Sequence, residues 1–145
     1  MEQLQTPLQI TLTVAMVACL VLALWRGGPS SRLAAGGMVL GSVLSALVQD
    51  RAHLEAAQWI IMGVDAAYLA LLLGLAWRSP AAWLIWAAAF QLAQTITHVS
   101  FALNPEVLGR AYVIGSYVLF AALLCALFAG LWPGLGRHDP GAGAR

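Results

Sequence analysis

Four polar side chains recur along the apolar stretch AAAFQLAQTITHVSF, residues 87–101. Gln91, Gln94, Thr95 and His98 stand at i, i+3, i+4 and i+7, a spacing that places them on one face of a helix. Amides donate and accept hydrogen bonds, and an imidazole can also exchange a proton near neutral pH. This stripe predicts either hydrogen bonds between helices or a site that handles a ligand or a proton.

A carboxyl group lies inside a second apolar stretch, at Asp65. A carboxylate in the middle of a membrane span costs about 2.5 kcal/mol or more, so we expect Asp65 to face other helices. It lies roughly 13 Å from the outer end of its span, at 1.5 Å per residue. Gln94 lies at a similar depth on the following, antiparallel stretch, and His98 lies nearer the outer surface. Asp65 and the stripe are therefore expected to meet.

Polar side chains on the neighbouring spans fall in the outer half of the membrane or near its middle, whereas the inner halves of the third to fifth spans are nearly pure Ala, Leu, Trp and Phe. We predict an outward-facing polar pocket among the second to fifth spans, closed on the cytoplasmic side by apolar packing. A structural role as hydrogen-bonding glue, worth about 0.6 kcal/mol per pair, is the alternative. The candidate pocket residues are Ser42, Ser45, Gln49, Asp65, Tyr68, Gln91, Gln94, His98, Tyr112, Ser116 and Tyr117.

The composition requires a membrane as solvent. Of the 145 residues, 61% are hydrophobic and 9% are charged, against about 25% charged residues in a soluble domain. Backbone groups in lipid must be satisfied within each segment, so the spans are expected to be helical. We predict an all-α integral membrane protein with one transmembrane domain, residues 1–132, and a disordered cytoplasmic tail, residues 133–145, that is rich in Gly and Pro. Its five spans are expected at about 8–25, 33–49, 56–77, 81–103 and 111–132.

The arginines predict the orientation. Cytoplasmic loops carry an excess of basic residues, and five spans place the termini on opposite sides. One side then holds five arginines and the other only Arg51 and Arg110, so we expect the N-terminus outside and the C-terminus inside. The acidic start MEQLQTP lacks the basic region of a signal peptide, so residues 8–25 are interpreted as a retained helix. An aromatic belt at the inner interface is expected from Trp25, Trp77, Trp83 and Trp132.

Small residues recur every four positions on three spans, a pattern that lets membrane helices approach closely. We interpret the pattern as packing within one bundle, with homodimerisation through the second span as the alternative. The three sets are Gly37, Gly41 and Ser45; Ala66, Ala70 and Gly74; and Ala122, Ala126 and Gly130.

No cofactor is expected. His98 is interpreted as a hydrogen-bonded residue or as a proton-handling partner of Asp65, and a haem or metal ligand is the least favoured role. The outer loop QDRAHLE groups Asp50, Arg51, His53 and Glu55, but these match no metal signature. Cys19 and Cys125 are interpreted as small packing residues within apolar runs.

The function predicted from the sequence is non-catalytic. With a net charge of +1, the chain lacks the strongly basic character that would indicate nucleic-acid binding. The sequence also contains no phosphate-binding, nucleophile-elbow or HExxH motif. All seven basic residues are arginine, which is typical of GC-rich bacterial genomes. We expect a small bacterial inner-membrane protein that binds a lipid or small hydrophobic ligand, or that serves as an accessory subunit, with the bilayer, a second copy or a larger complex as partner. The alternatives are an oligomeric small-solute or proton transporter using Asp65 and His98, and an intramembrane enzyme acting on an outer-leaflet substrate.

Overall fold

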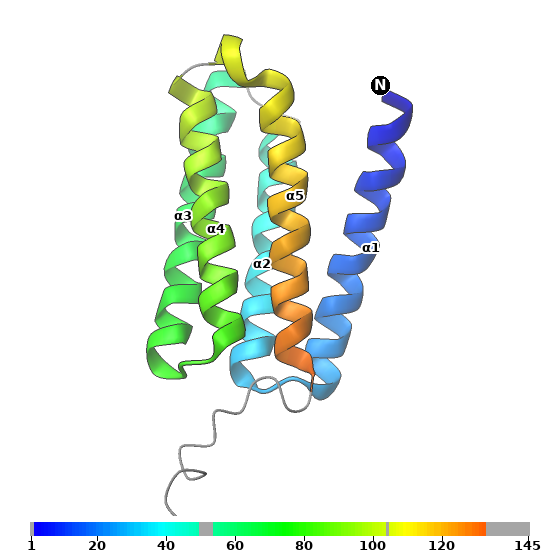
Figure 1. Cartoon of the computed structure of the whole chain (residues 1–145), viewed down its shortest axis with the longest axis vertical. Coiled ribbons are helices and arrows are strands. Elements are labelled where there is room, and N and C mark those ends of the chain that lie inside the picture. Colours follow the sequence, from blue (N-terminus) through cyan, green and yellow to red (C-terminus); the bar gives the residue numbers. More distant parts are fainter. Residues whose placement is uncertain (1, 50–53, 104, 133–145) are drawn as a thin grey trace, which may run out of the picture.

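Five helices lie side by side in the computed structural model, which describes residues 2–49, 54–103 and 105–132. Successive helices run in opposite directions, and α1 stands at the edge of the bundle, with its N-terminal end apart from α5 (Figure 1). The helices are α1 (Glu2–Arg26), α2 (Pro29–Gln49), α3 (Leu54–Arg78), α4 (Ala82–Leu103) and α5 (Pro105–Leu131). The predicted all-helical fold is thus confirmed.

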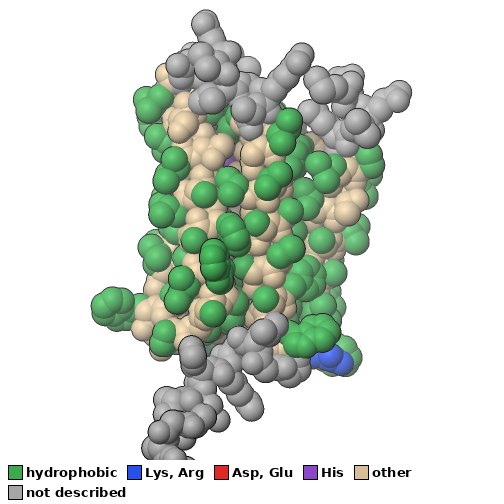
Figure 2. All heavy atoms as spheres, in the orientation of Figure 1, with side chains coloured by type: hydrophobic (Ala, Val, Ile, Leu, Met, Phe, Trp, Pro, Cys, Tyr) green, Lys and Arg blue, Asp and Glu red, His purple; other side chains and the backbone are tan. Residues whose placement is uncertain are grey.

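Four of these helices, α1, α2, α3 and α5, are long and apolar enough to cross a membrane. Among the described residues, α4 does not meet this criterion, although it has 22 residues. Gln91, Gln94 and His98 lower the hydropathy of α4. The chain therefore has the helices of a membrane protein, and the fifth span stays a prediction. Hydrophobic side chains cover the visible face along the length of the helices (Figure 2).

Short connections make neighbouring helices antiparallel. The backbone N–H of Gly27 donates to the carbonyl of Ala23 at 2.9 Å and closes α1, and α2 begins directly after Gly28. Pro29 suits the first position of α2, because proline lacks the N–H that would be unsatisfied there. The helix therefore starts four residues before the predicted second span, in the stretch that separates the predicted spans 8–25 and 33–49. Arg26, Arg32 and Arg78 consequently lie at one end of the bundle, which we call the arginine end, whereas Arg110, near the start of α5, lies toward the other end.

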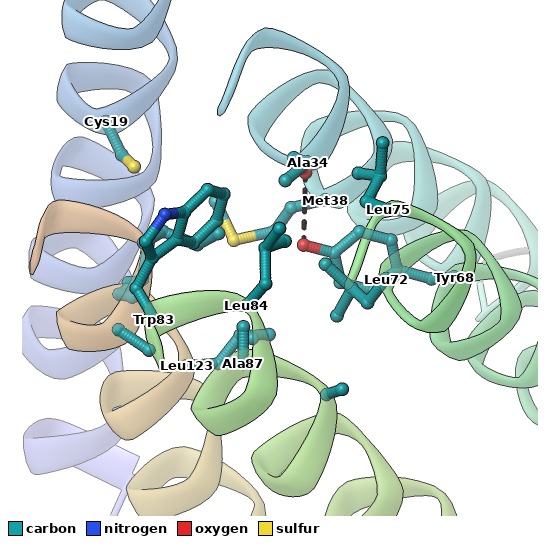
Figure 3. Packing of buried hydrophobic residues seen from close by; sticks show 14 of the residues in the cluster. Cys19, Ala34, Met38, Tyr68, Leu72, Leu75, Trp83, Leu84, Ala87 and Leu123 are labelled. Atoms are coloured by element: carbon teal, nitrogen blue, oxygen red, sulfur yellow. Dashed lines mark hydrogen bonds between the residues drawn. The ribbon is translucent and has the colours of Figure 1, made fainter. Parts of the chain in front are cut away.

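A core of apolar side chains fills the half of the bundle near the arginine end. Leu72, Leu84 and Cys19 are the largest fully buried side chains, and Met38 and Leu123 pack in the same cluster (Figure 3). Burial of a leucine side chain is worth about 1.5–3 kcal/mol in water, but in lipid the stabilisation comes from close packing. The core therefore depends on how well these side chains fit together.

Trp83 belongs to this core, and its assignment to an interfacial belt is wrong. Its side chain is 7% exposed and its ring packs directly on Gly130 of α5. Trp25, Trp77 and Trp132 are 72%, 91% and 71% exposed. These three tryptophans, and not Trp83, are available to an interface at the arginine end.

The small residues of α2 pack within the chain. A Cβ added at Gly37 would lie 2.6 Å from Leu71 Cδ2, and one at Gly41 would lie 3.4 Å from Val64 Cγ1, so this face of α2 is occupied by α3. Packing within one bundle is thus observed for α2, and homodimerisation through this span stays an alternative prediction. The set on α3 behaves differently, because Ala66, Ala70 and Gly74 are exposed.

We predict that Gly130→Ala destabilises the protein, because its methyl group would overlap the buried ring of Trp83. Overpacking of this kind costs about 1–3 kcal/mol. Gly74→Ala is the matched control, since nothing lies within 4 Å of a Cβ at that position, and its effect should stay within about 0.5 kcal/mol. Unfolding in mixed micelles, followed by circular dichroism, measures both. Equal stability of the two variants would show that the Trp83 contact is dispensable.

Candidate functional site

Asp65 of α3 meets two side chains of α4. Gln91 Nε2 donates a hydrogen bond to Asp65 Oδ1 at 3.0 Å, and Gln91 is only 3% exposed. His98 Nε2 lies 3.1 Å from Asp65 Oδ2, an ion-pair distance when the imidazole is protonated. Asp65 Oδ2 nevertheless receives no hydrogen bond from the described residues. One carboxylate oxygen is therefore satisfied by an amide, and the other has only an electrostatic partner.

His98 links Asp65 to α5. The hydroxyl group of Tyr112 lies 2.7 Å from His98 Nδ1, and the two rings meet edge to face at 5.4 Å. Phe101 stacks on Tyr112 with a centroid distance of 4.2 Å and holds the phenol in place. Three helices thus contribute to one chain of polar contacts, from Asp65 through His98 to Tyr112.

Gln94 contacts the same imidazole. Its amide Nε2 lies 3.0 Å from His98 Nε2, and it donates to this nitrogen when the imidazole is neutral and carries its proton on Nδ1, which then donates to the Tyr112 oxygen. A protonated imidazole donates from both nitrogens, and Gln94 must then rotate its amide to present Oε1. In the arrangement observed, Gln94 Oε1 is buried without a hydrogen-bond partner among the described residues.

These side chains form part of the wall of a cavity of about 180 Å³, which we call the inner cavity. It lies between α2, α3, α4 and α5. Its polar wall is formed by Ser42, Ser45, Asp65, Tyr68, Gln91, Gln94 and His98. Apolar side chains, among them Leu119 and Leu123, complete it.

A second cavity of about 430 Å³, here called the lateral cavity, adjoins the inner cavity and is lined by residues of α1, α2, α4 and α5. Ser45, Gln94, His98 and Phe120 line both cavities, so they form the partition between them. The lateral cavity adds apolar walls from Leu12 and Val113 and polar groups from both of its flanking helices. The polar groups of those helices are Gln9, Thr13, Tyr112, Ser116 and Tyr117.

The remaining candidates divide among the two cavities. Tyr68 contributes to the wall of the inner cavity, but its hydroxyl donates to the backbone carbonyl of Ala34 at 3.0 Å and so is used in helix packing. Ser116 lines the lateral cavity, and its Oγ is buried without a hydrogen-bond partner among the described residues. The side chain of Gln49 lies outside the described residues, as do Asp50, Arg51, His53, the side chain of Glu55 and the predicted tail.

Gln9 is the site residue that the sequence analysis missed. Its Nε2 donates to the Tyr117 hydroxyl at 2.6 Å and joins α1 to α5. The predicted pocket lies among the second to fifth spans, whereas in the structure the polar surface extends to α1. The available signal was the i, i+4 spacing of Gln9 and Thr13 in an apolar run.

The described part of the chain holds no group of three or more His, Cys, Asp or Glu side chains suited to a metal ion. Comparison with family models, with curated proteins and with solved structures finds no match, so the function is argued from the site alone.

We predict that His98→Leu destabilises the bundle and that adding Asp65→Asn restores most of the loss. Removing one partner of a buried ion pair costs about 3 kcal/mol, because the other charge is left uncompensated. The double variant has no buried charge at this place, so its stability should approach that of the wild type. The comparison uses unfolding free energies in mixed micelles. A double variant as unstable as His98→Leu alone would mean that lost packing, and not lost charge compensation, dominates.

Proposed function

We propose that this chain is a bacterial inner-membrane protein with five spans that binds an amphipathic lipid or small hydrophobic ligand without transforming it. It acts alone or as the accessory subunit of a larger complex. The observation that carries the proposal is the pair of adjoining cavities, whose shared wall includes His98 beside the buried carboxyl group of Asp65.

The fifth span of this proposal is α4. Its polar residues face neighbouring helices, as the burial of Gln91 and the contacts of His98 show. The opposite face is apolar and exposed: Ile85, Trp86 and Ile96 are 59%, 60% and 56% exposed. A helix with this distribution suits a bundle in lipid, although its mean hydropathy is lowered by the inward side chains. The excess of arginine at the arginine end supports its assignment to the cytoplasmic side.

The cavities suit an amphipathic molecule. Ligand sites usually enclose about 300–1,000 Å³ and combine apolar walls with a few polar groups, and the lateral cavity, of about 430 Å³, fits that description. Hydroxyl and amide groups line it beside Leu12, Val113 and Phe120. A polar group can therefore reach the partition while an apolar part stays between α1 and α5.

Proton or small-solute transport by an oligomer is the second candidate. The chain from Asp65 through His98 to Tyr112 favours it, because each member can pass or orient a proton. Toward the arginine end, however, the bundle is filled by Leu72, Leu84 and Leu123, which are 0%, 0% and 3% exposed. A solute would have to displace this core, which is why ligand binding is proposed first.

We predict that labelling of single cysteines will follow the five-span topology. In a chain with Cys19→Ala and Cys125→Ala, the variants His53→Cys and Asn104→Cys should react with a membrane-impermeant maleimide in intact spheroplasts. Ser79→Cys should react only after lysis. Because residues 79 and 104 flank α4, labelling of both from the same side would contradict a membrane-spanning α4.

We predict that Ser116→Phe reduces the lipid retained by the purified protein, because the new ring would occupy the lateral cavity. Ile114→Phe is the matched control on the same helix, since Ile114 is 65% exposed. Native mass spectrometry of both variants and the wild type, after gentle detergent extraction, gives the retained lipid per protein. Wild-type protein without bound lipid, or equal retention in both variants, would contradict the proposed function.

A further inference from the structure

Among the described residues, the two cavities are lined by one acidic side chain and by no arginine. Asp65 is the one acidic side chain that the structure describes, and the arginines whose side chains it describes, Arg26, Arg32 and Arg78, lie at the arginine end. Arg78 lies roughly 20 Å from Asp65 along α3, at 1.5 Å per residue. The chain contains no lysine. Among the side chains that the structure describes, His98 is therefore the group that can carry a positive charge beside Asp65.

The polar atoms around Asp65 include acceptors that receive no hydrogen bond from the described residues. Asp65 Oδ2 and Gln94 Oε1 are both buried acceptors without a donor among the described residues, and both residues line the inner cavity. A buried polar atom without a partner costs about 1–3 kcal/mol, and more when the group is charged. The inner cavity thus offers two acceptors and a negative charge to whatever enters it.

The size of the inner cavity limits the group that can enter. A cavity of about 150 Å³ holds a molecule the size of benzene, so the inner cavity, at about 180 Å³, accommodates a group of about six to eight non-hydrogen atoms. The rest of a larger ligand would extend past His98 and Gln94 into the lateral cavity.

We propose that the ligand is an amphipathic amine, whose ammonium group enters the inner cavity and donates hydrogen bonds to Asp65 Oδ2 and Gln94 Oε1. This inference rests on the proposed ligand-binding function and names its ligand class. The ammonium group replaces a protonated His98 as the counter-charge of Asp65, so His98 is neutral in the complex and keeps its contact with Tyr112. An anionic head group would be repelled by the Asp65 carboxylate.

Three probes of equal length test the ligand class: n-butylammonium, n-butanol and butyrate, compared at equal ionic strength on the full chain in detergent. A ligand that binds the folded state raises the unfolding midpoint, so n-butylammonium should raise it by about 3 °C or more. Butanol should have a smaller effect, and butyrate none. Asp65→Asn should abolish the shift, whereas Ile114→Phe, on the lipid-facing side of α5, should retain it.

The pH dependence of the wild type gives a second readout that needs no variant. A proton on His98 competes with the ammonium group, whereas n-butylammonium itself stays charged, because an alkylammonium such as that of lysine has a pKa of about 10.4. The other titratable side chains that the structure describes around the two cavities are Asp65, Tyr68, Tyr112 and Tyr117, and the polar lining residues from α2 are Ser42 and Ser45. The shift produced by n-butylammonium should therefore be larger at pH 8 than at pH 5.

The outcomes separate this inference from the proposed function. A shift by butanol equal to that by n-butylammonium, kept in Asp65→Asn, would overturn the amine and leave binding of a small amphiphile standing. No shift with any probe, or a larger shift at pH 5, would also overturn the amine. The proposed function is tested independently by lipid retention in Ser116→Phe.

Discussion

The cost of placing a carboxyl group among apolar helices organises the polar half of this bundle. Asp65 cannot face acyl chains without a penalty of about 2.5 kcal/mol or more, so α3 must turn it toward α4. Gln91 and His98, one on each side of Asp65 along α4, then supply a hydrogen bond and, when the imidazole is protonated, a counter-charge. Because His98 also contacts Tyr112, the same constraint extends to α5. The relative rotation of three helices follows from one side chain.

The two halves of the bundle are held together by different forces. Toward the arginine end, Cys19, Leu72 and Leu84 are fully buried, and Trp83 closes on Gly130. This half depends on shape, and small changes in volume are felt there. The other half depends on a few directed contacts and contains the cavities. The division suits a protein that must keep a rigid base while one end of the bundle accepts a guest.

The sequence predicted the helices and much of the site because both follow from local patterns. The depth of Asp65 within its run, and the helical spacing of Gln91, Gln94 and His98, were sufficient to place these residues on facing helices. The cavity-lining residues of α1 could not be predicted in the same way. The direction in which Gln9 points depends on how α1 docks, and an apolar helix with so little amphipathic character does not reveal its buried face.

Two further differences have physical reasons. A tryptophan near the end of a span can lie at the lipid interface or can fill a gap in the core, and Trp83 does the latter because Gly130 leaves room for its ring. The sequence also could not show which of the repeated small residues are buried. The same spacing packs α2 against α3 at Gly37 but leaves Gly74 exposed. Which face is covered is a property of the whole bundle.

The attachment of α1 is uneven along its length. Met16, Cys19 and Ala23 are buried near the arginine end, whereas toward the N-terminus the side-chain hydrogen bond from Gln9 to Tyr117 ties the described part of α1 to α5. The buried part of α1 is thus centred near Cys19. A few degrees of tilt about that point would break the hydrogen bond from Gln9 to Tyr117 and widen the lateral cavity, while the packing around Cys19 stays intact.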